Sequence, residues 1–184
     1  MKHLTYFLLP LLAFPLLLPA QDELRLPPED FRGFSVSAQG ALYIDGRGRF
    51  GWSLGGALTR IRGRHIFSFS YRYLRETPQQ DFLGPLMEQY DLYTLLYGRY
   101  YDWKENIRLQ AHVGIGRMQG YERRTLGEGL YNYSRRLSWG IPLRLQASYM
   151  LGAHLSVGLK TLFYISKKRM FYLPLLHLEV GLLR

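Results

Sequence analysis

The sequence predicts an all-β protein: a closed eight-stranded antiparallel transmembrane β-barrel with short periplasmic turns and two long outer loops. First, segments that alternate apolar and polar residues recur about eight times between Phe34 and Arg184, which is typical of membrane-spanning strands. Second, an apolar export signal precedes them. Third, aromatic residues make up 15% of the chain, as expected for a barrel with aromatic girdles at both membrane interfaces.

The chain divides into three parts. Residues 1–20 read as a cleavable signal peptide, because a short basic start precedes an apolar run that ends in Ala20 just before Gln21. Residues 21–33 lack periodicity and contain two prolines, so we expect a short periplasmic lead. Residues 34–184 form the barrel. The chain has no cysteine, so a lipidated lipoprotein is not expected. The alternating strands together with the signal predict a location in the cell outer membrane.

The expected strands follow from alternation and from the turn residues between them. The first three cover residues 34–44, 50–61 and 67–73, with turns at 45–48 and 62–64. A polar loop at 75–89 precedes a fourth strand at 90–101, whose faces are ambiguous because Leu92, Leu95 and Leu96 do not sort by parity. A turn at 102–106 leads to a fifth strand near 108–116.

The second half of the chain continues this pattern. A second long loop is expected near 120–136, before a sixth strand at 141–149 in which Pro142 suggests a bulge. A turn at 151–153 precedes a seventh strand at 155–163, and the eighth strand covers 176–182. Eight strands satisfy the even number that is usual for such barrels, and both long loops then lie on the outer side.

The composition of the polar face indicates which face of the sheet lines the inside of the barrel. A soluble lipid-carrying barrel would point its apolar face inward and cover its outside with charges. Here the polar face consists mainly of Gly and Ser with a few larger side chains, which suits the packed lumen of an eight-stranded barrel. We therefore expect a lumen network formed by Arg108, Gln110, His112, Arg144, Gln146, Lys160 and Glu179.

The net charge of +10 is concentrated near the expected outer loops. Arginine and lysine bind phosphate through charge-assisted hydrogen bonds, so a basic rim could contact anionic lipid, lipopolysaccharide or surface glycans. The residues of this rim are Arg47, Arg49, Arg123, Arg124, Arg135, Arg136, Lys167, Lys168 and Arg169. No nucleic-acid-reading motif accompanies these charges, so direct nucleic-acid binding is not expected.

Catalytic, cofactor and metal sites are not expected. The pair His154 and Ser156 resembles the catalytic pair of lipid A deacylases of the PagL type, but no acid follows Ser156 before Glu179. His154 also falls at the expected periplasmic end, whereas those enzymes work at the outer leaflet. The five histidines are scattered, and an eight-stranded barrel is too narrow for an open aqueous channel.

The stretch Phe50 to Thr59, the segment Tyr73-Leu74-Arg75 and the segment Gly120-Tyr121-Glu122 resemble the TraO family of conjugative-transposon proteins from Bacteroides-type bacteria. The likeness covers about residues 46–168. It implies a noncatalytic outer-membrane barrel that acts as an anchor or scaffold in a conjugative DNA-transfer apparatus. The terminal Leu182-Leu183-Arg184 departs from the final aromatic residue of proteobacterial barrels.

Two other functions stay open at this point. One is a general surface barrel of the OmpA/OmpX type that stabilises the envelope or binds lipopolysaccharide, and the other is a lipid A-modifying barrel enzyme. The expected partners are outer-membrane lipid and lipopolysaccharide, the barrel-assembly machinery and, from the resemblance, other conjugation proteins.

Overall fold

The structure is a computed structural model that describes residues 24–25, 31–46, 48–77, 88–103, 106–127, 130–167 and 169–183. The expected signal peptide therefore lies outside the described residues. Eight long strands form the fold: β2 (Arg32–Asp45), β3 (Phe50–Arg62), β4 (His65–Glu76), β5 (Gln89–Trp103), β6 (Ile107–Gly127), β7 (Leu130–Met150), β8 (Leu155–Ser166) and β9 (Met170–Leu182). The described residues contain no helix that is long and apolar enough to cross a membrane.

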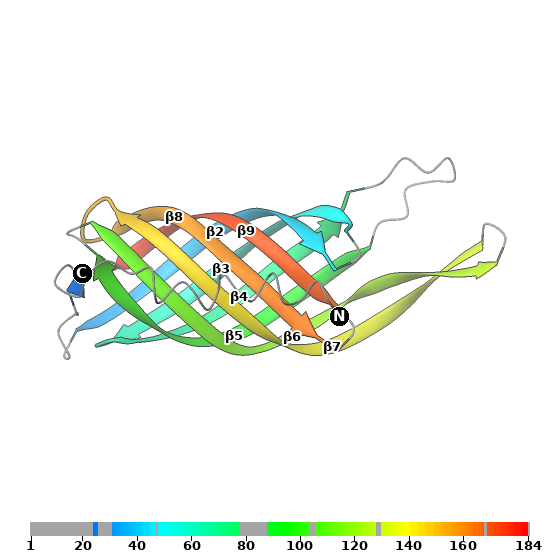
Figure 1. Cartoon of the computed structure of the whole chain (residues 1–184), viewed down its shortest axis with the longest axis horizontal. Helices are drawn as coiled ribbons and strands as arrows, with labels where there is room; N and C mark the ends of the chain where they lie inside the picture. Colours follow the sequence, from blue (N-terminus) through cyan, green and yellow to red (C-terminus); the bar gives the residue numbers. More distant parts are fainter. Residues whose placement is uncertain are drawn as a thin grey trace.

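The eight strands close into an antiparallel barrel (Figure 1). Each strand pairs with the next along the chain, and β2 also pairs with β9, which joins the two edges of the sheet. Closure leaves no sheet edge along the wall, so the backbone groups of the wall pair within the sheet. The predicted fold class is therefore confirmed.

The two ends of the barrel differ. At the terminal end, β2 begins, β9 ends and short turns join the strands. One of these is the two-residue turn Gly63-Arg64, in which the φ of 55° at Gly63 favours glycine. The other end, called here the loop end, carries the connection after β4 and the long β6–β7 hairpin. Figure 1 shows this hairpin extending beyond the rest of the barrel, on the side opposite the C-terminus.

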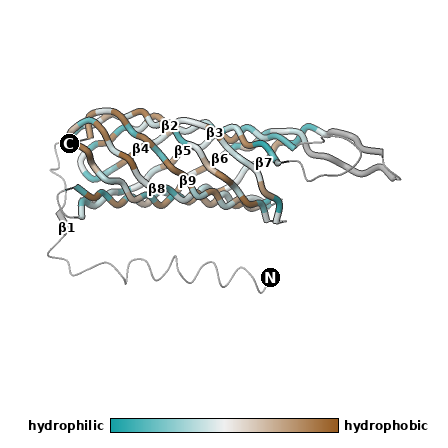
Figure 2. Tube along the Cα trace, turned by 90° about the horizontal axis from the view of Figure 1, so that it is seen from above, coloured by the Kyte–Doolittle hydropathy of each residue, from teal (hydrophilic) through white to brown (hydrophobic). Residues whose placement is uncertain are grey.

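Alternation along each strand separates the two faces of the wall. In β2 the odd residues from Gly33 to Asp45 are buried apart from Ala41, while their even neighbours are exposed, and Figure 2 shows hydrophobic and hydrophilic segments alternating along the strands. The exposed positions are mostly apolar: Leu42, Leu159 and Leu176 are 72%, 64% and 68% exposed. Apolar side chains thus cover the outside, and small polar side chains such as Ser35 and Ser37 face the lumen.

Four expectations about the elements need correction. The lead contains a two-residue strand, β1 (Leu24–Arg25), that pairs with β5, and the barrel begins at Arg32 rather than Phe34. Most of the expected loop at 120–136 is a β-hairpin, because β6 and β7 each run for 21 residues. Pro142 causes no bulge. Pro142 has no partner in the β6–β7 ladder, and the ladder has the same register on both sides of this gap.

The ambiguous strand at 90–101 alternates regularly. Leu92 and Leu96 are buried in the lumen, whereas Leu95 is exposed on the outside. Its pairing with both neighbours keeps one register throughout. Parity failed to separate these leucines because the lumen of this barrel has apolar layers as well as polar ones.

Candidate functional site

The middle of the lumen holds a hydrogen-bonded polar cluster centred on Glu179. Its carboxylate accepts hydrogen bonds from the hydroxyl of Ser35 and, at 3.3 Å, from the amide of Gln146. The same amide lies 2.8 Å from the Ser148 hydroxyl and 3.2 Å from Nε2 of His177. These side chains come from β2, β7 and β9, so the cluster links the two strands of the seam to β7, which lies beyond β8.

Three buried cations surround this cluster. Arg144 donates hydrogen bonds to Nδ1 of His112 at 3.3 Å and to the hydroxyl of Ser68 at 3.2 Å. Arg72 donates to the amide oxygen of Gln39, and Lys160 lies 3.5 Å from the hydroxyl of Ser37. None of the three cations forms an ion pair with a carboxylate among the described residues.

The seven residues expected in the lumen network are all buried, at 2–6% exposure. The structure brings Gln146 and Glu179 into direct contact and places Arg144 against His112. Gln110 lies opposite Gln146 in the β6–β7 register, and Lys160 lies near Ser37, which is not one of the seven. Arg108 lies apart from them: it forms a bidentate pair with Asp102 at 2.7 and 3.1 Å, and its guanidinium lies 4.1 Å from the ring centroid of Tyr100.

Several buried polar residues were not included in the expected network, above all Arg72, His177 and Gln39. The signal for Arg72 was present, since it lies between Tyr71 and Tyr73 on the polar face of a clearly alternating strand. Membership of a network depends on neighbours across the barrel, and a single strand's alternation gives only the face.

An apolar layer separates the polar cluster from the loop end. It contains Tyr43, Leu74, Tyr90, Leu92, Met118, Leu162, Tyr164, Phe171, Leu173 and Leu175. The rings of Tyr43 and Phe171 meet edge to face, with centroids 5.7 Å apart. A smaller group, Ile61, Ile66 and Tyr100, is buried at the terminal end. The polar middle therefore lies between two apolar groups.

An ion cluster covers the apolar layer at the loop end. Arg49 donates to Asp45 at 2.7 Å and to Glu88 at 2.9 Å, and also contacts Glu76 at 3.1 Å. Arg169 contacts the same Glu88 carboxylate at 2.9 Å. We call these five residues the loop-end ion cluster.

The loop-end ion cluster changes the acidity of its carboxyl groups. Burial alone would raise the pKa of Glu88, but hydrogen bonds from Arg49 and Tyr90 and the charge of Arg169 lower it to about 2. Burial raises the pKa of Glu76 above its ordinary value even though Arg49 lies beside it. The pKa values of the two acids are thus shifted in opposite directions within one cluster.

Only some residues of the expected basic rim are exposed at the surface. Arg49 and Arg169 turn into the mouth of the lumen, because Asp45 and Glu88 offer them carboxylates there. Arg135 and Lys167 are exposed and Arg136 is half-buried. Arg123 and Arg124 lie in β6, but their side chains, like Arg47 and Lys168 as a whole, are outside the described residues.

The lumen contains a serine and a histidine in hydrogen-bond reach. The hydroxyl of Ser148 lies 3.2 Å from Nε2 of His177, and Glu179 approaches that same nitrogen at 4.0 Å. In a hydrolytic triad the acid orients the histidine through its other ring nitrogen. Here that nitrogen, Nδ1 of His177, is buried without a described partner, and Ser148 is only 2% exposed. This geometry does not activate a nucleophile.

The pair singled out from the sequence is also separated. His154 is exposed, and its Nδ1 lies 3.1 Å from the carbonyl oxygen of Gly181. Ser156 points into the lumen at 1% exposure, and its hydroxyl has no described partner. The described residues contain no group of three or more acidic or histidine side chains that could hold a metal ion.

Solved structures with the same fold are small outer-membrane barrels. The N-terminal β-barrel domain of Pseudomonas aeruginosa OprF matches with a TM-score of 0.61 and 9% identity, covering 81% of this chain and 96% of that one. Ail of Yersinia pestis, solved with the heparin analogue sucrose octasulfate, matches with a TM-score of 0.56 and 10% identity, covering 82% and 98%. The outer membrane enzyme PagL matches with a TM-score of 0.50 and 12% identity, covering 78% and 98%.

These identities establish likeness of fold alone. No protein-family model matches the chain, and no curated protein matches it. The neighbours thus agree with the closed eight-stranded barrel, and because they include an enzyme, the fold leaves both catalytic and noncatalytic functions open.

Proposed function

We propose that this protein is a noncatalytic outer-membrane barrel that displays the β6–β7 hairpin at the cell surface. The observation that carries the proposal is the length of this hairpin above a wall whose outside is apolar. Pairing of β5 with β6 begins at Gln89 and Tyr121, and pairing of β7 with β8 begins at Gly140 and Ser166. Residues 122–127 and 130–134 therefore pair only with each other, beyond the wall, and residues 135–139 pair only with β6.

The membrane orientation follows from this asymmetry. Outer-membrane barrels keep short turns on the periplasmic side and longer segments outside. The terminal end, with its two-residue turn after β3, would face the periplasm, and the hairpin would face the medium. Lipid would then cover the exposed Leu, Val and Phe side chains, which no soluble surface of this extent would expose.

The lumen supports a noncatalytic function. Its polar cluster is enclosed between apolar groups, and its serine and histidine lack the geometry of a triad. The likeness to PagL keeps a lipid A-modifying enzyme as the competing function. A deletion strain should therefore show an unchanged lipid A mass spectrum, and a shift restored by the wild-type gene would establish the enzyme instead.

The ligand class we propose for the hairpin is an anionic surface glycan. Residues 122–136 contain four arginines and two glutamates, so the hairpin carries net positive charge. Arginine pairs with sulfate and phosphate oxygens through bidentate hydrogen bonds. The complex of the fold neighbour Ail with sucrose octasulfate is consistent with such a surface on a barrel of this shape.

Binding of labelled sucrose octasulfate to intact cells tests this ligand class. We expect Arg123→Gln combined with Arg124→Gln to reduce binding by tenfold or more, since each arginine contributes about 1 kcal/mol near an anionic surface. The matched control is Arg60→Gln combined with Arg62→Gln, which removes equal charge at the terminal end. Equal loss in both variants, or loss in neither, would contradict glycan binding by the hairpin.

The resemblance to the TraO family supports a more specific function, as a scaffold in a conjugative DNA-transfer apparatus. The supporting evidence is the sequence likeness over residues 46–168, and the hairpin would be the contact surface. Deletion should then lower transfer frequency while leaving envelope permeability unchanged. Normal transfer from the deletion strain would remove this function and leave the general surface barrel.

A further inference from the structure

A row of basic side chains crosses the outside of the barrel at the terminal end. Arg32 pairs with Arg62, Arg62 with His65, and His65 with Arg99, so the four are neighbours on β2, β3, β4 and β5. All four are exposed on the outer face. We call them the basic row. None of them forms an ion pair within the described part of the chain, although like charges on paired strands repel each other.

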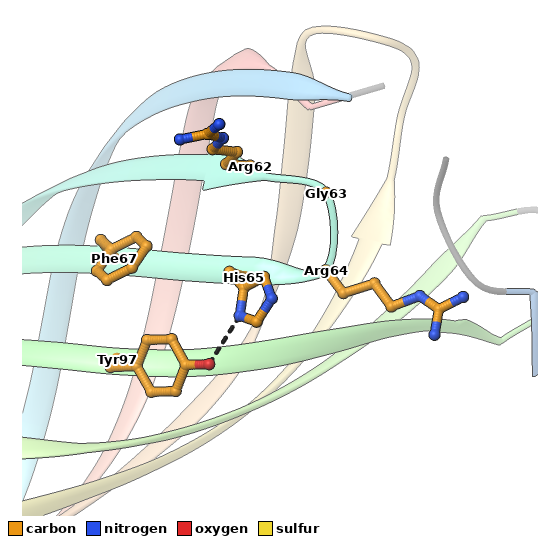
Figure 3. Close-up of a pocket in the computed structure, with 6 residues that line it drawn as sticks. All are labelled: Arg62, Gly63, Arg64, His65, Phe67 and Tyr97. Atoms are coloured by element: carbon orange, nitrogen blue, oxygen red, sulfur yellow. Dashed lines mark hydrogen bonds between the residues drawn. The ribbon is translucent and has the colours of Figure 1, made fainter. Parts of the chain in front are cut away.

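A pocket of about 610 Å³ opens beside the basic row, at the β3–β4 turn. Figure 3 shows Phe67, His65 and Tyr97 close together, with Arg62 on the neighbouring strand and the Arg64 side chain extending away from the rings. The lining residues are Arg62, Gly63, Arg64, His65, Phe67 and Tyr97. Phe67 and Tyr97 are cross-strand partners with ring centroids 5.3 Å apart, and the Tyr97 hydroxyl lies 2.7 Å from Nδ1 of His65. Nε of Arg64 is shielded from solvent without a described hydrogen-bond partner.

The position of this pocket in the membrane decides what can enter it. In the proposed orientation, on which this inference rests, the terminal end lies at the headgroup level of the inner leaflet. Tyrosine is enriched at that level, and arginine there can reach phosphate oxygens. An aromatic wall that faces hydrocarbon is accessible to an acyl chain but not to a soluble acidic protein.

We propose that this pocket binds the headgroup of an anionic glycerophospholipid of the inner leaflet. Arg62 and Arg64 contact its phosphate, and one acyl chain lies against Phe67 and Tyr97. The remaining members of the basic row, Arg32 and Arg99, hold further anionic lipid around this site. A bound phosphate also supplies the negative charge that the row lacks among its described neighbours.

Native mass spectrometry of the full-length mature protein tests the proposal. The protein is folded in vesicles of phosphatidylcholine with or without phosphatidylglycerol, extracted in mild detergent, and its retained lipids are counted. We expect the wild type to retain phosphatidylglycerol, and Arg62→Gln or Arg64→Gln each to weaken retention by about fivefold. The matched control is Arg75→Gln combined with Arg117→Gln, two exposed outward arginines of the loop half.

Each outcome has a defined meaning. Unchanged phosphatidylglycerol retention in both single variants, or an equal loss in the control, overturns the site. Displacement of the lipid by inorganic phosphate shows a site for free anions and also overturns it. Phe67→Ala should weaken phosphatidylglycerol retention as well, and unaltered retention overturns the acyl contact. Failure of outer-membrane localisation in cells would overturn the proposed function without affecting this lipid measurement.

Discussion

The hydroxyl of Tyr164 in β8 donates a hydrogen bond to the carbonyl oxygen of Gly116 in β6, 3.3 Å away, so the contact spans the intervening strand β7. The Tyr164 ring also occupies the space beside Gly140, the cross-strand partner of Gly116. A Cβ at either glycine would lie 2.7 Å from the ring. Two glycines paired across β6 and β7 thus make room for one buried aromatic side chain.

This contact predicts the effect of adding a methyl group. Gly116→Ala should lower the free energy of unfolding by about 1–3 kcal/mol, because the Tyr164 ring must leave its position in a packed lumen. Urea unfolding in lipid vesicles measures the change. Gly40→Ala is the control, since a Cβ there would meet no atom within 4 Å. Similar losses at both positions would show that the ring contact contributes nothing.

Glu179 should be more important than its hydrogen bonds alone suggest. It is the sole carboxylate described in the polar middle, which also holds Arg72, Arg144 and Lys160. Glu179→Gln keeps the shape but leaves buried cations without an opposite charge, so we expect a loss of about 3–5 kcal/mol in urea unfolding. Ser35→Ala removes one hydrogen bond to the same carboxylate and should cost less, about 1.5–3 kcal/mol. Equal losses would contradict a dominant effect of charge.

The loop-end ion cluster should weaken in acid. Glu88 has a folded pKa of about 2, below the ordinary value of about 4.3, so its ionised form stabilises the folded state above that ordinary value. The stabilisation should fall as pH drops from about 4.3 towards 2. The chemical shift of the Glu88 carboxyl carbon follows this titration. Arg49→Gln should move the midpoint upward, and an unmoved midpoint would show that Arg49 is not the cause.

Exposed apolar positions should reject charge according to membrane depth. Ile115 is 58% exposed on the outside of β6, opposite the exposed Leu95. Ile115→Arg should cost about 2–4 kcal/mol and slow the shift in gel mobility that marks barrel folding. Tyr121→Arg, at the base of the hairpin, should cost at most about 1 kcal/mol. The reverse order would mean that the membrane crosses the barrel elsewhere.

Single cysteines can report orientation, because the chain contains none of its own. A cysteine replacing Gly127 should react with a membrane-impermeant maleimide in intact cells, since it ends the β6 arm of the hairpin. A cysteine replacing Ala153, in the turn between β7 and β8, should react only after the cells are permeabilised. Labelling with the opposite pattern would place the hairpin in the periplasm.

The sequence predicted the wall better than the contacts within it. Alternation placed the residues of β2, β3 and β4 on their correct faces, because the middle of each lumen face is small or polar and only its ends are apolar. It failed for Leu92 and Leu96, which enter an apolar lumen layer that no local pattern reveals. The β6–β7 hairpin resembled a loop because residues 120–136 are rich in charge and glycine, and pairing between two extended segments supplies their order.

The functional surfaces depend even more on distant neighbours. Arg49 turns inward because Glu88 follows a connection 39 residues later in the chain. The basic row exists because the registers of three strand pairs place Arg32, Arg62, His65 and Arg99 side by side. No spacing along one strand predicts such a row, since each of its members comes from a different strand.

The pairing of β2 with β9 also has a consequence for how the protein is made. Ser37 pairs with Glu179, so the final seam joins residues from opposite ends of the chain. Such a contact has the largest sequence separation and forms slowly. The chain must lose the entropy of closing a long loop before the contact can stabilise it. An incomplete chain would keep two open edges. The barrel therefore cannot close until the last strand of the chain is available to pair with β2.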